Sequence, residues 1–160
     1  MHLGIEMPEK SQRVFDSEII IDEKSRWYFR GNEITLDSVL SYFKENLDED
    51  ENGIFILNTY GELSEKGYVS CMGYPLKFID YQIESGQLFL LGDNKQKFSL
   101  QDLQLHADLE EKIFFKKKGQ KYLKYSLNRD THSKISEYIE EENGNYFLKY
   151  ANHVQKITLI

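Results

Sequence analysis

Short apolar segments, rich in aromatic and β-branched residues, follow one another through most of this 160-residue chain. Turn residues separate several of them, at Gly73–Pro75, Ser85–Gly86 and Gly92–Asn94. Aromatic side chains make up 14% of the residues, and they pack well on the pleated surface of a sheet. This spacing predicts many strands joined by tight turns. The predicted strands are residues 18–22, 27–29, 54–60, 68–72, 76–83, 87–91, 113–115, 122–127, 146–150 and 154–160.

Two segments have the helical period instead. The apolar residues that define the first helix are Leu36, Val39, Leu40, Phe43 and Leu47. They fall on one helical face, with Thr35 as the predicted N-cap and the acidic stretch 48–53 as the predicted turn that follows. A second helix is predicted over residues 130–141. The segment Lys97–Leu105 fits either a strand or a short helix that Ser99 caps.

The combined pattern predicts an α+β protein, in which a twisted antiparallel sheet carries the two short helices on its faces. Residues 27–43 resemble residues 123–139, and an acidic stretch, an Asn-Gly pair and an apolar strand follow each helix. This predicts a flexible N-terminal arm of residues 1–17 and two similar helix-plus-strand subdomains, 18–94 and 95–160. Two unrelated units with common turn chemistry, or one continuous domain, remain open alternatives.

Charge and cysteine content narrow the classes of partner. The formal net charge is −7, with 27 acidic and 20 basic residues, whereas a protein that grips a phosphate backbone usually has the opposite balance. Nucleic acid is therefore an unlikely partner for the whole chain. The single cysteine, Cys71, permits no intramolecular disulfide, and we expect it to be a small buried apolar residue. No apolar run has the length of a membrane span or a signal peptide, so a cytoplasmic location without a membrane is expected.

A basic cluster on the predicted 113–127 hairpin is the first candidate site. Between residues 112 and 134 there are eight basic residues and one acidic residue, in a chain that is acidic overall. The lysines of a possible patch for an anionic partner are Lys112, Lys116, Lys117, Lys118, Lys121 and Lys124. Their alternative role is to keep the hairpin soluble and its strand edges unpaired.

Aromatic residues form the second candidate site. The residues of this possible aromatic pocket are Trp27, Tyr28, Tyr122 and Tyr125. Packing in the core is the alternative explanation, because large flat side chains contribute much of the burial energy of a sheet.

Other motifs indicate no chemistry. Asp48, Asp50 and Asn52 resemble the first half of a calcium loop, but Thr59 stands where the loop needs a bidentate glutamate, so a solvated acidic turn is predicted. The four histidines lack metal-ligand spacing, and no nucleophile elbow, Cys-x-x-Cys or phosphate loop is present. We therefore expect no catalytic residues, no cofactor and no metal.

The first third of the chain resembles a bacterial family of unknown function. The residues that carry the resemblance are Ile21, Asp22, Trp27, Gly31, Ile34, Val39, Phe43, Leu47, Gly53, Phe55 and Leu57. They match the opening of the family numbered twelve-eighty-five among domains of unknown function, and the similarity continues loosely to residue 140. The resemblance implies an α+β fold of two similar subdomains, a role in regulation or ligand binding, and no family catalytic residue to carry over.

These observations predict an uncharacterised bacterial protein that acts as a non-catalytic binding or regulatory module for a small ligand or a protein partner. The rival prediction is a small-molecule enzyme with its site in the cleft between the subdomains. Self-association into a homo-oligomer is a third.

Overall fold

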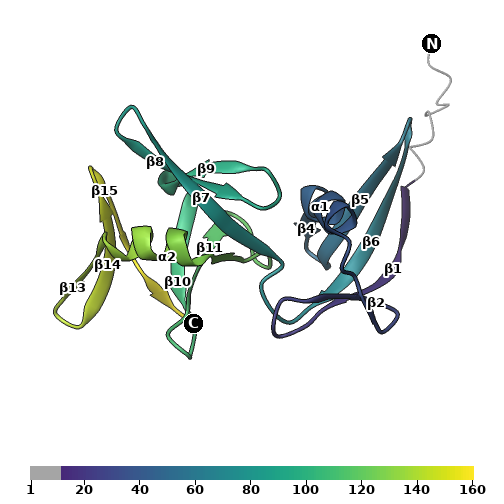
Figure 1. The fold of residues 1–160 in the computed structure, drawn as a ribbon, viewed down its shortest axis with the longest axis horizontal. Coiled ribbons are helices and arrows are strands. Elements are labelled where there is room, and N and C mark those ends of the chain that lie inside the picture. The colour runs from purple at the N-terminus through teal and green to yellow at the C-terminus, as the bar shows by residue number, and fades with distance from the viewer. Residues whose placement is uncertain (1–11) are drawn as a thin grey trace, which may run out of the picture.

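The computed structural model describes residues 12–160, which form two lobes side by side along the longest axis (Figure 1). The first lobe contains β1 (Gln12–Ile21), β2 (Trp27–Phe29), β3 (Asn32–Glu33), α1 (Asp37–Glu45), β4 (Leu47–Asp50), β5 (Gly53–Tyr60) and β6 (Leu63–Cys71). The second lobe contains β7 (Leu76–Glu84), β8 (Gln87–Gly92), β9 (Lys97–Ser99), the 3-10 helix η1 (Leu100–Asp102), β10 (Leu103–Ala107), β11 (Ile113–Lys117), β12 (Tyr125–Leu127), α2 (Arg129–Ser136), β13 (Ile139–Glu142), β14 (Asn145–Tyr150), β15 (His153–Lys156) and β16 (Thr158–Leu159).

Within residues 12–160 the fold is α+β, with two mixed sheets, one antiparallel sheet and two short α-helices. The first lobe has one sheet in the order β3-β2-β1-β6-β5-β4, and the second has sheets in the orders β16-β10-β11-β12-β7-β8-β9 and β13-β14-β15. The prediction of a purely antiparallel sheet is wrong, because β1 runs parallel to β6, β12 to β7 and β10 to β16. These parallel pairs join strands that lie far apart in the sequence, so local patterns carry no signal for them.

After β7, β8, β9 and η1, which have no counterpart in the first lobe, the second lobe follows the order of elements of the first. In the first, the hairpin β1-β2 leads to α1 and the meander β4-β5-β6, whose last strand returns parallel to β1. In the second, the hairpin β10-β11 leads through β12 to α2 and the meander β13-β14-β15, after which β16 runs parallel to β10.

Matching contacts define the register of this repeat. Leu47 pairs with Ile56 as Ile139 pairs with Leu148. Leu47 therefore occupies the place of Ile139, whereas the predicted alignment matched Phe43 with Ile139. That alignment is wrong by about one helical turn.

The predicted boundaries differ from the division of the sheets. The sheet of the first lobe ends with β6, and residue 94 lies between β8 and β9 of a single sheet in the second lobe. The predicted arm is wrong over residues 12–17, which belong to β1, and residues 12–16 pair with residues 64–68 of β6. Residues 1–11 of that arm lie outside the described residues.

The helix ends also differ from the predictions. Leu36, not Thr35, is the N-cap of α1, and its side chain makes no capping hydrogen bond. The predicted acidic turn 48–53 is wrong, because β4 begins at Leu47 and only two residues separate it from β5. Asn128 caps α2 by accepting a hydrogen bond from the Thr131 backbone N–H at 2.9 Å. This helix ends at Ser136, because β13 begins at Ile139.

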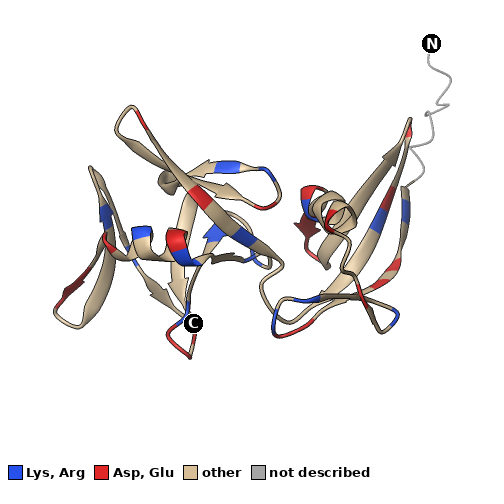
Figure 2. Cartoon of the chain, viewed as in Figure 1, with Lys and Arg blue, Asp and Glu red and all other residues tan. Residues whose placement is uncertain are grey.

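Buried residues from both lobes form one connected apolar cluster. The cluster reaches from Ile19 and Ile21 in the first lobe to Leu148 and Ile157 in the second. Ion pairs join the lobe surfaces: Lys44 Nζ lies 2.7 Å from Asp93 Oδ2. Figure 2 shows that both lobes carry residues of both signs, with basic positions at the end of β11.

Candidate functional site

A cavity of about 360 Å³ lies where the two lobes meet. The first lobe contributes an apolar wall from the start of β5 and the end of β6, formed by Ile54, Val69, Cys71 and Met72. The second lobe contributes Lys116 of β11, Lys121, Tyr122 and Lys124 of the loop before β12, and Ile160. We call this cavity the lysine pocket.

The alternation of side chains along β11 decides which lysines reach the pocket. Successive residues of a strand point to opposite faces of the sheet. Lys116 therefore lines the lysine pocket, whereas Lys117 lies on the other side, with its Nζ 5.5 Å from the centre of the Phe98 ring. The structure thus brings together three of the six predicted patch lysines, Lys116, Lys121 and Lys124.

The other lysines of the predicted patch lie outside the pocket. Lys112 places its Nζ 4.6 Å from the centre of the Tyr74 ring, and Lys118 is exposed. Among the lysines that do line the pocket, Lys124 places its Nζ 5.1 Å from the centre of the Phe114 ring, and this cation–π contact holds it in position.

The loop that carries Lys121 and Lys124 is fixed by the first lobe. The backbone N–H groups of Lys121, Tyr122 and Leu123 donate to the carboxylate of Glu49, at 2.9, 3.0 and 2.8 Å. Glu49 belongs to β4, so an edge strand of one lobe positions the basic loop of the other. This residue was missed because it lies in an acidic stretch that predicted only a solvated turn.

The pocket places three lysines close together, with the carboxylate of Glu49 near Lys116. Burial, and secondly the positive charge of Lys124, lower the pKa of the half-buried Lys116 ammonium. Across residues 12–160, none of the three pocket lysines forms an ion pair. Positive charges crowded beside an apolar wall attract an anion more strongly than dispersed surface lysines do.

The four predicted aromatic residues do not share a pocket. Trp27 is buried and stacks on Phe43, with ring centres 6.2 Å apart. Tyr125 is also buried, and its hydroxyl accepts a hydrogen bond from Asn94 at 3.0 Å. Tyr28 lies beside Arg26, 5.8 Å from its guanidinium carbon to the ring centre. Only Tyr122 lines the lysine pocket.

His106 lies beside the two more buried lysines. Its ring stacks on Phe114 at 5.2 Å, and its buried Nδ1 has no hydrogen-bond partner among the described residues. Burial, followed by the charges of Lys116 and Lys124, lowers its pKa below the ordinary value of 6.5.

Acidification is therefore expected to destabilise the protein through His106. Below pH 6.5 the His106 side chain binds a proton in the unfolded chain but not in the folded chain. The free energy of unfolding therefore keeps its full value above that pH and decreases as the pH falls towards the lowered pKa. His106→Phe keeps a ring against Phe114 but does not titrate. Urea unfolding at a series of pH values should show a weaker pH dependence for the variant, and identical pH dependences would contradict this assignment.

Residues 12–160 contain no cluster of three or more His, Cys, Asp or Glu side chains placed to hold a metal. No helix in the same range has the length and apolar character needed to cross a membrane.

Two solved structures are similar in fold to this chain. A DUF1285 family protein from Silicibacter pomeroyi DSS-3 superimposes with a TM-score of 0.70 at 13% sequence identity, over 95% of this chain and 87% of that one. The chain has the fold of a DUF1285 family protein. A second DUF1285 family protein, from Shewanella baltica OS155, gives a TM-score of 0.54 at 13% identity, over 74% of this chain and 90% of that one.

The resemblance predicted from the sequence is thus confirmed at the level of the fold. No known family profile matches the sequence, and no curated protein matches it. The shared DUF1285 fold extends over both lobes, because 95% of the chain is covered, and the lysine pocket lies where those lobes meet.

Proposed function

We propose that this protein is a non-catalytic binding module that holds a small molecule with an apolar body and an anionic head in the lysine pocket. The observation that carries the proposal is the placement of three lysines without ion-pair partners, within residues 12–160, opposite an apolar wall. A cavity of about 360 Å³ falls within the range of small-molecule sites, about 300–1,000 Å³.

The two walls of the lysine pocket contact different parts of the proposed ligand. Lys116 and Lys124 are half-buried, so their attraction for an anionic head is screened less than that of exposed lysines. Ile54 and Val69 offer apolar contact to the body of the ligand. Tyr122, exposed at the rim, supplies a ring face to either part.

A regulatory role follows from the position of the pocket between the lobes. A ligand that contacts both walls binds only when the lobes are docked, so it stabilises that arrangement by an amount that grows with its concentration. We propose that the protein acts in this way in the bacterial cytoplasm, a reducing compartment suited to the free thiol of Cys71.

The rival enzyme function would need a reactive group in the same cleft. Cys71 is the natural nucleophile there, but burial raises the pKa of its thiol to about 11. The thiol also donates to the Gly73 carbonyl oxygen at 3.3 Å. It therefore stays protonated near neutral pH, and the thiolate that attacks substrates is scarce. This favours binding over thiol catalysis.

Anilinonaphthalene sulfonate, which joins an apolar body to an anionic head, is a suitable probe. We expect isothermal titration calorimetry to show one site, and Lys116→Gln or Lys124→Gln to weaken binding about five-fold each, the factor equivalent to about 1 kcal/mol. Neutral phenyl-naphthylamine should bind less tightly and should respond to neither substitution.

Lys118→Gln is the matched control, because it removes an exposed lysine of the same region that does not line the pocket. Equal losses in all three variants would indicate general electrostatic attraction and would refute a specific pocket.

A further inference from the structure

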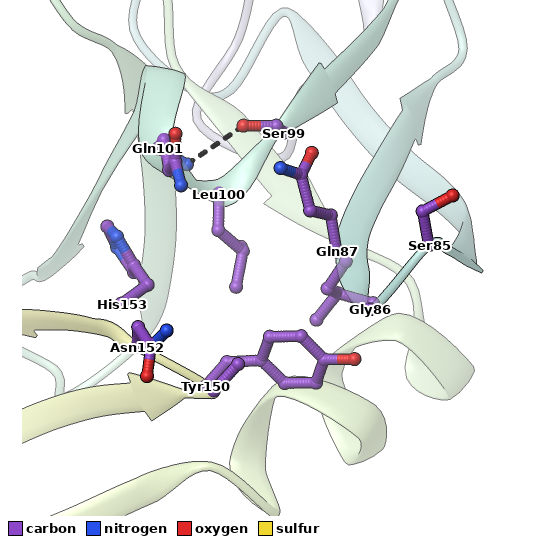
Figure 3. Close-up of a pocket in the computed structure, with 11 residues that line it drawn as sticks. Ser85, Gly86, Gln87, Ser99, Leu100, Gln101, Tyr150, Asn152 and His153 are labelled. Carbon is purple, nitrogen blue, oxygen red and sulfur yellow. Dashed lines mark hydrogen bonds between the residues drawn. The ribbon is translucent and has the colours of Figure 1, made fainter.

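A second cavity, of about 250 Å³, lies wholly within the second lobe (Figure 3). The β7–β8 turn, η1 and the β14–β15 turn surround it. It shares no lining residue with the lysine pocket. We call it the polar pocket.

The lining of the polar pocket is rich in hydrogen-bonding groups and has no Lys, Arg, Asp or Glu side chain. Gln87, Gln101 and Asn152 supply amides, each of which both donates and accepts. Among the hydrogen bonds found within residues 12–160, none involves these three side-chain amides. All three residues are exposed, so a ligand would replace water at these donors and acceptors.

Apolar surface lies between these polar groups. In Figure 3 the Tyr150 ring extends across the pocket below Leu100, while Gln87 and Gln101 lie on opposite sides. Tyr138 packs edge-on against the Tyr150 ring, with ring centres 4.9 Å apart, and fixes its position. An aromatic ring with side-chain amides around it suits a molecule with apolar C–H surface and a rim of hydroxyl groups.

His153 also lines the polar pocket, and its hydrogen-bond geometry favours the neutral ring. Gln155 is oriented by two backbone contacts: its Oε1 accepts from Leu105 N–H at 2.7 Å, and its Nε2 donates to the Leu103 carbonyl at 3.0 Å. The same Nε2 lies 2.7 Å from His153 Nε2, which must therefore act as an acceptor. A protonated ring would set two donors against each other. Burial, and secondly Lys118, also lower the pKa of His153.

We infer that the polar pocket binds a neutral, polyhydroxylated small molecule about the size of a single sugar ring. A charged ligand would find no opposite charge in the lining, and its loss of hydration would go uncompensated. The volume lies just below the range of drug-sized sites, which favours a small ring over a larger ligand.

Nuclear magnetic resonance of the isotopically labelled protein tests this with myo-inositol and D-glucose as probes. At least one probe is expected to shift the Gly86 backbone amide and the side-chain amides of Gln87, Gln101 and Asn152 saturably. Inorganic phosphate should leave these signals unchanged and shift those of Lys116 and Lys124, so that the two sites succeed or fail separately.

Variants check that the amides make the contacts. Gln87→Ala and Gln101→Ala should each weaken binding about five-fold, because each removes one hydrogen-bonding partner. Gln82→Ala, an exposed glutamine of β7 that does not line the pocket, should leave the affinity unchanged. The absence of saturable shifts with both probes, affinities that are the same in all three variants, or displacement of the probe by phosphate would each overturn the inference.

Discussion

Replacing Phe78 by alanine is expected to lower the free energy of unfolding by about 3–5 kcal/mol, a large fraction of the stability of an ordinary small domain. Phe78 is fully buried and stacks on Tyr125, with ring centres 4.4 Å apart. Phe98 and Phe115 also pack edge-on against Phe78, with ring centres 6.3 and 5.8 Å from the centre of its ring. Alanine would leave a cavity between three rings that belong to three different strands, and these cannot all move inward.

Urea unfolding followed by circular dichroism measures this loss. Because the alanine variant risks not folding, Phe78→Leu provides a second measurement, with an expected loss of about 1–2 kcal/mol. Phe29→Ala is the matched control: Phe29 is 40% exposed, so its loss should stay below about 1 kcal/mol. Equal losses at Phe78 and Phe29 would show that the ring cluster is not the centre of the core.

Local periodicity predicted many of the strands, because the apolar residues that identify a strand lie within the strand itself. The hairpin of residues 113–127 is confirmed by the pairing of Phe115 with Tyr125. The ambiguous segment Lys97–Leu105 contains both predicted elements, since β9 and β10 flank η1 and Ser99 caps it. In both segments, residues only a few positions apart determine whether the chain forms a strand or a short helix.

Pairing between distant strands was not predictable in the same way. The acidic residues of β4 have turn-like composition, and only the apolar strand β5 beside them makes residues 47–50 a strand. Residues 12–17 look like a polar arm until β6, some fifty residues later, provides a parallel partner. A single sequence holds no signal that specifies such a partner.

The lysine pocket contains some residues that the local sequence predicted and others that only distant contacts bring to the site. Its lysines were predicted as a group, and the alternation of β11 separates Lys116 from Lys117 as the period of two requires. Its apolar wall was missed, because Ile54 and Val69 are ordinary strand residues in the sequence. They become part of a site only when the lobes dock.

Glu49 is the residue through which that docking is best tested, and Glu49→Ala is expected to lower the free energy of unfolding by about 2 kcal/mol. The substitution leaves the backbone N–H groups of residues 121–123 without their shared acceptor. Hydrogen bonds to a charged group contribute about 1.5–3 kcal/mol when buried, and partial exposure of this loop reduces the sum.

The same change should weaken binding of anilinonaphthalene sulfonate, because Lys121 and Lys124 lose the contact that positions their loop. Glu51→Ala removes a neighbouring exposed carboxylate and keeps the Glu51 backbone carbonyl, which is the group that accepts from the Tyr122 hydroxyl, so it should change neither quantity. Glu49→Gln separates charge from shape, since its amide oxygen still accepts but carries no negative charge. Urea unfolding and calorimetry on the three variants decide the matter. If Glu49→Ala matched Glu51→Ala in both stability and affinity, the edge of β4 would not be what holds the basic loop in place, and the lysine pocket would have to be assembled by the other contacts between the lobes, the apolar cluster and ion pairs such as Lys44–Asp93.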